Sequence, residues 1–227
     1  HIGVPLTLLE LNNSHDLAII EMGANKPFDI KELAEIAEPT HGIITNIGAA
    51  HLEGFGSKEG VLKTKKELYE FIEDIGGTIF YNLDDDILSE IVPMATEHIT
   101  YGTGPATTIS GAIVDIQPEI IFDYVTTWDD NSRRITSQII GKYNFYNMLA
   151  AVCIGDYFEL SPEEIKKGIE SYSPENNRSQ VKKTENNTLI LDAYNANPTS
   201  VESALESFAA MKNEDKFFIL GDMLELG

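Results

Sequence analysis

The sequence is poor in cysteine and in positive charge. Its single cysteine, Cys153, cannot form an internal disulfide, which fits a reducing compartment and predicts a cytoplasmic location. Because Cys153 stands in the apolar run 150–154, we expect a packed core thiol rather than a nucleophile. With 16 Lys and Arg against 37 Asp and Glu, the net charge is −21, which argues against a nucleic-acid binder.

Long apolar runs and the common phosphate-binding loop are missing as well. No apolar run approaches the ~20 residues that span a bilayer, so we expect no membrane insertion. The pattern Gly-x-x-x-x-Gly-Lys followed by Ser or Thr does not occur in these 227 residues. We therefore expect that this stretch alone cannot cradle the phosphates of a nucleotide.

Apolar periodicity predicts an α/β fold for residues 15–95. Short apolar runs at 15–20 and 42–44 and a β-branched run at 78–82 indicate strands, while 29–37 and 57–75 have helical spacing. This strand–helix alternation is typical of a mostly parallel sheet with helices on its faces.

The second half of the chain predicts a meander and then a new domain. Residues 107–140 are strand-rich with polar turns at 117–118 and 129–131, which favours a small antiparallel meander appended to the main sheet. Helices are expected at 144–157 and from a capping box at 161–164 to about 172. After a linker at 173–177, a hairpin (181–192), a helix (198–211) and a strand (216–220) begin a second α/β domain. We thus predict domains at 1–175 and 176–227.

Two of the predicted strands lead into polar side chains. The run 15–20 ends in Glu21, and the run 42–44 leads through small residues to His51. Since ligands of open α/β sheets bind at the carboxyl ends of strands, Glu21 and His51 are candidates for a shared site. They suit a divalent metal or an acid/base pair, although His51 could equally cap a loop.

Several motifs resemble the Mur ligase family. Three segments match motifs of the family's central ATPase domain: Glu21–Asn25, Thr45–Ser57 and Lys65–Leu68. Four further motifs follow the family order: Gly3–Leu9, Gly141–Ala151, Asp192–Ser200 and Leu220–Gly227. The resemblance covers essentially the whole chain. Within the family, these motifs are similar to those of the members that add D-alanyl-D-alanine to a UDP-muramoyl tripeptide.

The resemblance implies an excised piece of a longer ligase. The family carries its phosphate loop and its UDP-binding domain upstream of the Gly3–Leu9 motif. The central domain would therefore be incomplete at its N-terminus and the C-terminal domain truncated. We expect the 227-residue fragment to be inactive alone.

The family chemistry implies ATP and Mg²⁺ as cofactors. ATP phosphorylates the tripeptide carboxylate, and the amine of D-Ala-D-Ala attacks the acyl phosphate. The resemblance assigns magnesium binding to Glu21, His51 and Lys65, with Lys65 carbamylated by CO₂, and catalytic roles to Lys65 and His51. Without the resemblance, Lys63, Lys65 and Lys66 are ordinary solvated lysines of a helix.

The nucleotide and substrate contacts are expected further along the chain. Asn144 and Asn147 are three residues apart on a helix and face the same direction, so their amides could bind an adenine edge; a helix cap is the alternative for Asn144. The resemblance assigns Arg178 to the phosphates and Asp192 to the ribose. The resemblance also places three residues near D-Ala-D-Ala or the nucleotide: Tyr194, Asn195 and Asn197. The alternative is that this segment is only the turn that leads into a helix.

The chain departs from the family pattern at two positions. Tyr143 stands where the family usually has His, which affects the detail of the adenine contact. Asn177 stands where the family generally has Gly before the arginine. Because Asn also tolerates a positive φ, we expect the turn to survive.

Three other functions compete with a cell-wall ligase. A folylpolyglutamate-type ligase shares the ATPase core, but the motif Asp192–Ser200 favours the cell-wall enzyme. A non-catalytic nucleotide-sugar or scaffold protein could use the same fold. A metal-dependent hydrolase built on Glu21 and His51 would need further ligands that the sequence does not place near them.

Overall fold

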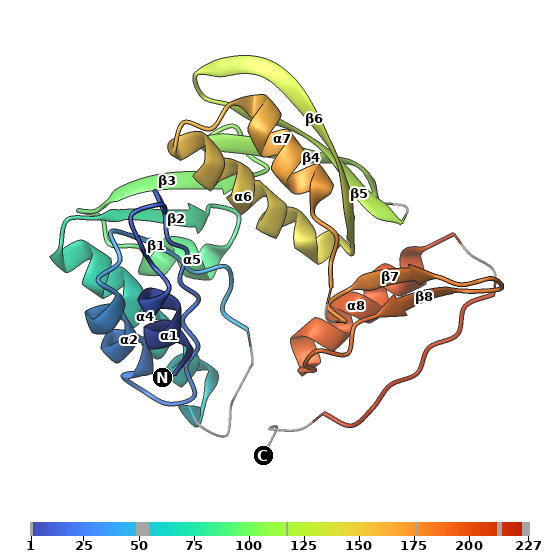
Figure 1. The fold of residues 1–227 in the computed structure, drawn as a ribbon, viewed down its shortest axis with the longest axis horizontal. Helices are drawn as coiled ribbons and strands as arrows, with labels where there is room; N and C mark the ends of the chain where they lie inside the picture. The colour runs from blue at the N-terminus through green and yellow to red at the C-terminus, as the bar shows by residue number, and fades with distance from the viewer. Residues whose placement is uncertain (1, 49–54, 117, 176, 213–214, 224–227) are drawn as a thin grey trace. The chain divides into compact units, whose positions relative to one another are not determined.

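The computed structural model describes residues 2–48, 55–116, 118–175, 177–212 and 215–223 (Figure 1). The chain divides into two compact units. Among the described residues, the first comprises 2–81 and 85–98, and the second comprises 82–84 and 99–223.

Six strands form one sheet in the order β1-β2-β3-β4-β5-β6. The strand bounds are β1 His41–Ile43, β2 Thr78–Asn82, β3 Glu97–Gly102, β4 Ile109–Ile116, β5 Glu119–Thr126 and β6 Asp129–Ile140. β1 pairs parallel with β2, and the end of β3 pairs parallel with the start of β4. β4, β5 and β6 are antiparallel neighbours. The predicted α/β class, with an antiparallel meander appended to the main sheet, is confirmed.

The helices of the first unit are α1 Gly3–Leu9, α2 Asp29–Ala37, α4 Lys58–Asp74 and α5 Asp86–Ile91. The Ser57 side chain caps α4 by accepting the Gly60 N–H. α2 packs on α4, and α4 packs against β1. A Cβ on Gly42 of β1 would meet Ile72 Cγ1 of α4 at 3.0 Å, so glycine permits this close approach.

A buried carboxylate joins α4 to the start of α2. Glu67 is 8% exposed and accepts the backbone N–H groups of Phe28 at 2.9 Å and Lys31 at 3.0 Å. These N–H groups lie at the N-terminus of α2, where no intrahelical acceptor exists. Glu67 therefore acts as a helix cap supplied by another helix.

The second unit packs α6 Phe145–Tyr157 against β4 and β5, and α7 Pro162–Ser171 against β6 and α6. Ser161 and Glu164 form the predicted capping box at the start of α7. Cys153 is fully buried in α6, and burial raises the pKa of its thiol to about 12. The prediction of a packed core thiol is confirmed.

The last described elements are β7 Gln180–Lys183, β8 Thr188–Leu191 and α8 Pro198–Ala210. β7 and β8 pair as an antiparallel hairpin that forms a sheet of its own. The 3-10 turn η1 Lys142–Asn144 precedes α6 in the second unit. The predicted hairpin and helix are confirmed.

Two predicted strands are wrong. Residues 15–20 and 216–220 belong to no strand, and apolar side chains in them are exposed: Ile19 at 81% and Ile219 at 86%. A strand exists only where a neighbour accepts its backbone hydrogen bonds, and the described residues provide no such neighbour for either segment. No helix in the described part of the chain is long and apolar enough to cross a bilayer.

Candidate functional site

Lys65 lies on the face of α4 that is turned toward the sheet. Tyr69, one turn further along α4, is fully buried; its hydroxyl donates to the Phe80 carbonyl at 3.4 Å and accepts the Ile44 N–H at 3.3 Å. The i, i+4 spacing puts Lys65 on the same face. Its ammonium donates to the Asn46 carbonyl at 2.8 Å, just beyond the end of β1. Burial of Lys65 lowers the pKa of its amine.

The neighbouring lysines have different surroundings. Lys63 is exposed on the far side of α4. Lys66 is 39% exposed and forms an i, i+4 ion pair with Glu70 at 3.5 Å. Lys65 combines partial burial, a contact just beyond a strand end and a lowered pKa of its amine.

The other two predicted metal ligands are Glu21 and His51. Glu21 is exposed in the irregular segment that follows residues 15–20. His51 lies outside the described residues. Within the described ranges, no three His, Cys, Asp or Glu side chains are grouped so that they could hold a metal ion. The metal site predicted from Glu21, His51 and Lys65 therefore stays a prediction.

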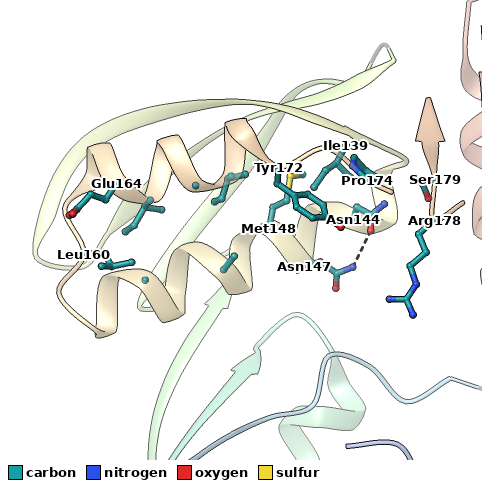
Figure 2. Close-up of a pocket in the computed structure, with 15 residues that line it drawn as sticks. Ile139, Asn144, Asn147, Met148, Leu160, Glu164, Tyr172, Pro174, Arg178 and Ser179 are labelled. Carbon is teal, nitrogen blue, oxygen red and sulfur yellow. Dashed lines mark hydrogen bonds between the residues drawn. The ribbon is translucent and has the colours of Figure 1, made fainter. Parts of the chain in front are cut away.

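An elongated pocket of about 600 Å³ lies between α6 and α7. Its interior is apolar, and most of its polar side chains, Asn144, Asn147, Arg178 and Ser179, lie toward one end (Figure 2). Figure 2 shows Glu164 and Leu160 at one end of the pocket and Arg178 at the other. Apolar walls with a few polar groups at the mouth are typical of small-molecule sites.

Asn144 and Asn147 line this pocket at its polar end. The Asn147 amide donates to Asn144 Oδ1 at 3.1 Å, and the Asn144 amide donates to the Ile140 carbonyl at 2.9 Å. Asn144 occupies the N-cap position of α6, but its side chain makes no capping hydrogen bond. The capping alternative for Asn144 is therefore not what the structure contains.

Arg178 sits in a turn between two residues in the left-handed region. Asn177 has φ 59° and Ser179 has φ 52°. The predicted positive φ at Asn177 is confirmed. The Arg178 guanidinium lies 3.7 Å from the centroid of the Tyr194 ring, which is a cation–π contact. Arg178 and Tyr194 also line a second, more polar hollow of about 540 Å³.

Asp192 is bound to this turn. Its carboxylate accepts the Ser179 N–H at 3.0 Å and the Ser179 hydroxyl at 3.4 Å. Asp192 is thus linked to the turn that carries Arg178 through Ser179, and the nucleotide roles of both residues stay predictions.

The segment 194–197 is occupied with local contacts. Asn195 Oδ1 accepts the Ala196 N–H at 2.8 Å, and Asn197 caps α8 by accepting the Ser200 N–H at 2.9 Å. Tyr194 contacts Arg178 and is 61% exposed. For Asn197, the helix-entry role is therefore present in the structure, and a substrate role stays a prediction.

Sequence reasoning missed two participants in the Arg178 turn. The Tyr143 hydroxyl lies 2.6 Å from Ser179 Oγ, across 36 residues of sequence. Burial raises the pKa of Tyr143, with the hydrogen bond to Ser179 opposing it. The substitution of Tyr for the family His was the one available sign, but only the tertiary structure identifies its partner.

The folded chain combines an α/β sheet, a partly buried lysine beyond the end of a strand, and a pocket with Arg178 at one end. This arrangement is that of an α/β protein with a candidate small-molecule site. Two family models match it: the Mur ligase middle domain over residues 1–155, and the Mur ligase glutamate ligase domain over residues 177–227. The chain belongs to the Mur ligase family.

Relatives with sequence similarity carry a consistent name. A UDP-N-acetylmuramoyl-tripeptide–D-alanyl-D-alanine ligase of Bacillus subtilis is 34% identical over 230 residues, covering 100% of this chain and 49% of the relative. A ligase of the same name from Haemophilus influenzae is 33% identical, again over 100% of this chain and 49% of the relative. The chain thus spans about half the length of these relatives.

A solved structure is similar as well. MurF from Acinetobacter baumannii matches with a TM-score of 0.83 and 29% identity, covering 93% of this chain and 46% of that chain. The folylpolyglutamate synthase of Thermotoga maritima matches with a TM-score of 0.58 at 14% identity, which reflects the shared fold alone.

Proposed function

We propose that the protein carrying this chain is an ATP-dependent amide ligase that adds D-alanyl-D-alanine to a UDP-N-acetylmuramoyl tripeptide, a step in peptidoglycan precursor synthesis. Two relatives of that name match the whole chain at 33–34% identity, which favours this function over a folylpolyglutamate-type ligase. We further propose that residues 1–175 form an incomplete central domain and 176–227 the start of the C-terminal domain. The predicted cytoplasmic location belongs to this proposal.

The observation that carries the proposal is the environment of Lys65. A lysine amine must lose its proton before it can react with CO₂, and an unperturbed lysine is almost fully protonated at neutral pH. Burial lowers the pKa of Lys65, and its nitrogen points at the strand end that leads toward His51. These properties favour carbamylation of Lys65 over the same reaction at Lys63 or Lys66.

A carbamate at Lys65 would be an anionic oxygen ligand, which suits Mg²⁺. Glu21 and His51 would complete the ligand set in the proposed site. Bound magnesium would neutralise the negative charge of the phosphates during transfer. Lys65 fits this role through its partial burial and lowered pKa, whereas the role of Glu21 rests on the resemblance.

The pocket end near Asn144 and Asn147 is the proposed adenine site. Amide groups can both donate and accept, which suits the edge of a purine, and the apolar walls suit its faces. Asn147 is exposed, and its amide oxygen accepts no hydrogen bond from the described residues, which leaves that oxygen available to a base.

Arg178 is the proposed phosphate ligand and Asp192 the proposed ribose ligand. A guanidinium presents several N–H donors to phosphate oxygens, and a carboxylate accepts from ribose hydroxyls. Tyr194, Asn195 and Asn197 are proposed to lie near D-Ala-D-Ala or the nucleotide. The contact of Tyr194 with Arg178 supports a common site for these two side chains.

The test is ligation by the full-length protein that contains this chain. We expect ATP-dependent joining of D-Ala-D-Ala to the UDP-muramoyl tripeptide, with one ADP and one phosphate released per amide. Mass spectrometry of the product and a phosphate-release assay would measure it. Glutamate addition to a folate, or no ligation with D-Ala-D-Ala, would contradict the proposal.

A further inference from the structure

The turn at Asn177–Ser179 is held in an unfavourable backbone conformation. Both residues that flank Arg178 have φ between 50° and 60°, although neither is glycine. Asn tolerates this region through its short polar side chain, but Ser has no such advantage. A left-handed serine persists only where its surroundings fix it.

Three hydrogen bonds to two side chains, Asp192 and Tyr143, fix Ser179. Its N–H donates to Asp192 Oδ1 at 3.0 Å, its Oγ lies 3.4 Å from the same carboxylate oxygen, and the Tyr143 hydroxyl lies 2.6 Å from that Oγ. Ser179 is 7% exposed, so these partners replace water. On the other side of Arg178, the Asn177 carbonyl accepts the Ala193 N–H at 2.8 Å.

The direction of the hydrogen bonds follows from the partners. An ionised carboxylate can only accept, so the Ser179 hydroxyl donates to Asp192. The Ser179 oxygen then has lone pairs left for the proton of Tyr143. The phenol donates to the serine, and the serine donates to the carboxylate, in one continuous chain.

Tyr143 can reach Ser179 because of the glycine two residues before it. Gly141 has φ +86°, and a Cβ there would meet the Tyr143 ring at 2.5 Å. A residue with a side chain at position 141 would force the ring to move. The backbone before α6 is therefore shaped to place the phenol at the Arg178 turn.

We propose that Tyr143 is a positioning residue for Arg178: its hydroxyl holds Ser179 in the left-handed conformation that presents the arginine at the pocket mouth. The inference rests on the proposed function, since it takes Arg178 as the phosphate ligand. It also links the two departures of this chain from the family pattern. Tyr143 and Asn177 belong to the same turn, one as its support and the other as a left-handed residue within it.

Amide hydrogen exchange in the full-length protein tests whether the Tyr143 hydroxyl holds Ser179 in place. Tyr143→Phe keeps the ring and removes only the hydroxyl, so we expect about tenfold faster exchange of the Ser179 N–H. Tyr146→Phe is the matched control, because the Tyr146 hydroxyl donates to Asp84 at 3.1 Å, whereas that of Tyr143 lies beside Ser179. The control should change Ser179 exchange less than twofold. Unchanged Ser179 exchange in Tyr143→Phe overturns the proposal.

Steady-state kinetics test whether Tyr143 positions Arg178 for ATP. We expect Tyr143→Phe to raise KM for ATP about five- to tenfold while KM for D-Ala-D-Ala changes less than twofold. In an Arg178→Ala background, Tyr143→Phe should add less than a twofold effect, because the side chain that it positions is gone. Equal effects of Tyr143→Phe with and without Arg178 would overturn the proposal in favour of a merely structural role.

A rescue variant separates this mechanism from general damage. Glycine adopts φ 52° without a steric cost, so in a Ser179→Gly background the support from Tyr143 should be unnecessary. We expect Tyr143→Phe to change KM for ATP less than twofold there, and a full-sized effect would overturn the proposal. An Arg178→Ala variant with normal ATP kinetics would instead contradict the proposed function of Arg178, whatever Tyr143→Phe does.

Discussion

Lys65 and Arg178 are two candidate site residues that the fold holds in different ways. Lys65 stands on a 17-residue helix, one turn from the fully buried Tyr69, and is itself partly buried. Arg178 is exposed and stands in a turn whose flanking residues are left-handed. Regular structure places the lysine, whereas side-chain hydrogen bonds place the arginine. We therefore expect the role of Lys65 to be lost mainly when Lys65 itself is replaced. The role of Arg178 should also be affected when residues of its turn are replaced.

The largest effect is expected at Lys65 itself. Lys65→Ala removes the proposed carbamate ligand and should lower kcat of the full-length ligase by at least about a hundredfold. A short carboxylic acid such as acetate or formate should partly restore turnover by filling the vacated ligand position. Ligation rates with and without added acid measure both effects.

Lys63→Ala and Lys66→Ala are the matched controls, because both change the same helix but leave the hydrogen bond from Lys65 to the Asn46 carbonyl in place. Each should change kcat less than about threefold, as expected for exposed lysines. Normal activity in Lys65→Ala together with a severe loss in Lys66→Ala would show that the register is wrong by one residue.

The helix that carries Lys65 also carries Glu67, on which the start of α2 should depend. Glu67→Ala leaves two N–H groups at the start of α2 without their acceptor, and we expect a loss of about 2–3 kcal/mol in the free energy of unfolding. Urea denaturation followed by circular dichroism measures it. Glu70→Ala, which removes an exposed partner of Lys66, should cost less than about 0.5 kcal/mol. Equal losses at Glu67 and Glu70 would contradict the capping role.

The arginine turn should respond to backbone preference. Asn177→Ala places a residue with a Cβ and no polar side chain at φ 59°, which should cost about 1 kcal/mol of stability. Asn177→Gly should be within about 0.5 kcal/mol of the original protein. Thermal melts of the two variants give the comparison, and a larger loss in the glycine variant would refute the role of the positive φ.

The smallest effect is a pH dependence of stability from Lys65. Burial lowers the pKa of the Lys65 amine in the folded state below its pKa in the unfolded state. At pH values between these two pKa values, the unfolded state therefore binds more protons than the folded state. The contribution of Lys65 to stability should rise with pH through the folded pKa, level off near the unfolded value of ~10.4, and be lost again as the pH falls. The difference in unfolding free energy between the original protein and Lys65→Met should follow this direction. A difference that falls with rising pH would contradict it.

Local patterns predicted most of the secondary structure. The bounds of α2 and β2 follow from helical spacing at 29–37 and from the β-branched run at 78–82, and Ser161 with Glu164 marks the start of α7. The errors occurred at 15–20 and 216–220, where apolar composition favoured strands that have no paired neighbour. Strand pairing is a tertiary property, so composition alone could not decide it.

The candidate site was predictable in part. The motif at 65–68 identified Lys65, but its contact with the Asn46 carbonyl depends on how α4 packs on β1. Asn144 was expected either to bind a ligand or to cap α6, and in the structure its side chain makes no capping hydrogen bond. His51 lies outside the described residues, so its role stays a prediction.

The sequence by itself determined the family, the order of the helices and most strands, and the residue types available for chemistry, because these depend on local periodicity and on motifs. Only the tertiary structure decided which of the lysines at 63, 65 and 66 reaches the Asn46 carbonyl and which tyrosine contacts Ser179. Those outcomes depend on contacts between residues as far as 36 positions apart, such as Tyr143 with Ser179. Burial and long-range hydrogen bonds arise from packing, and packing is fixed by the whole fold rather than by any local segment.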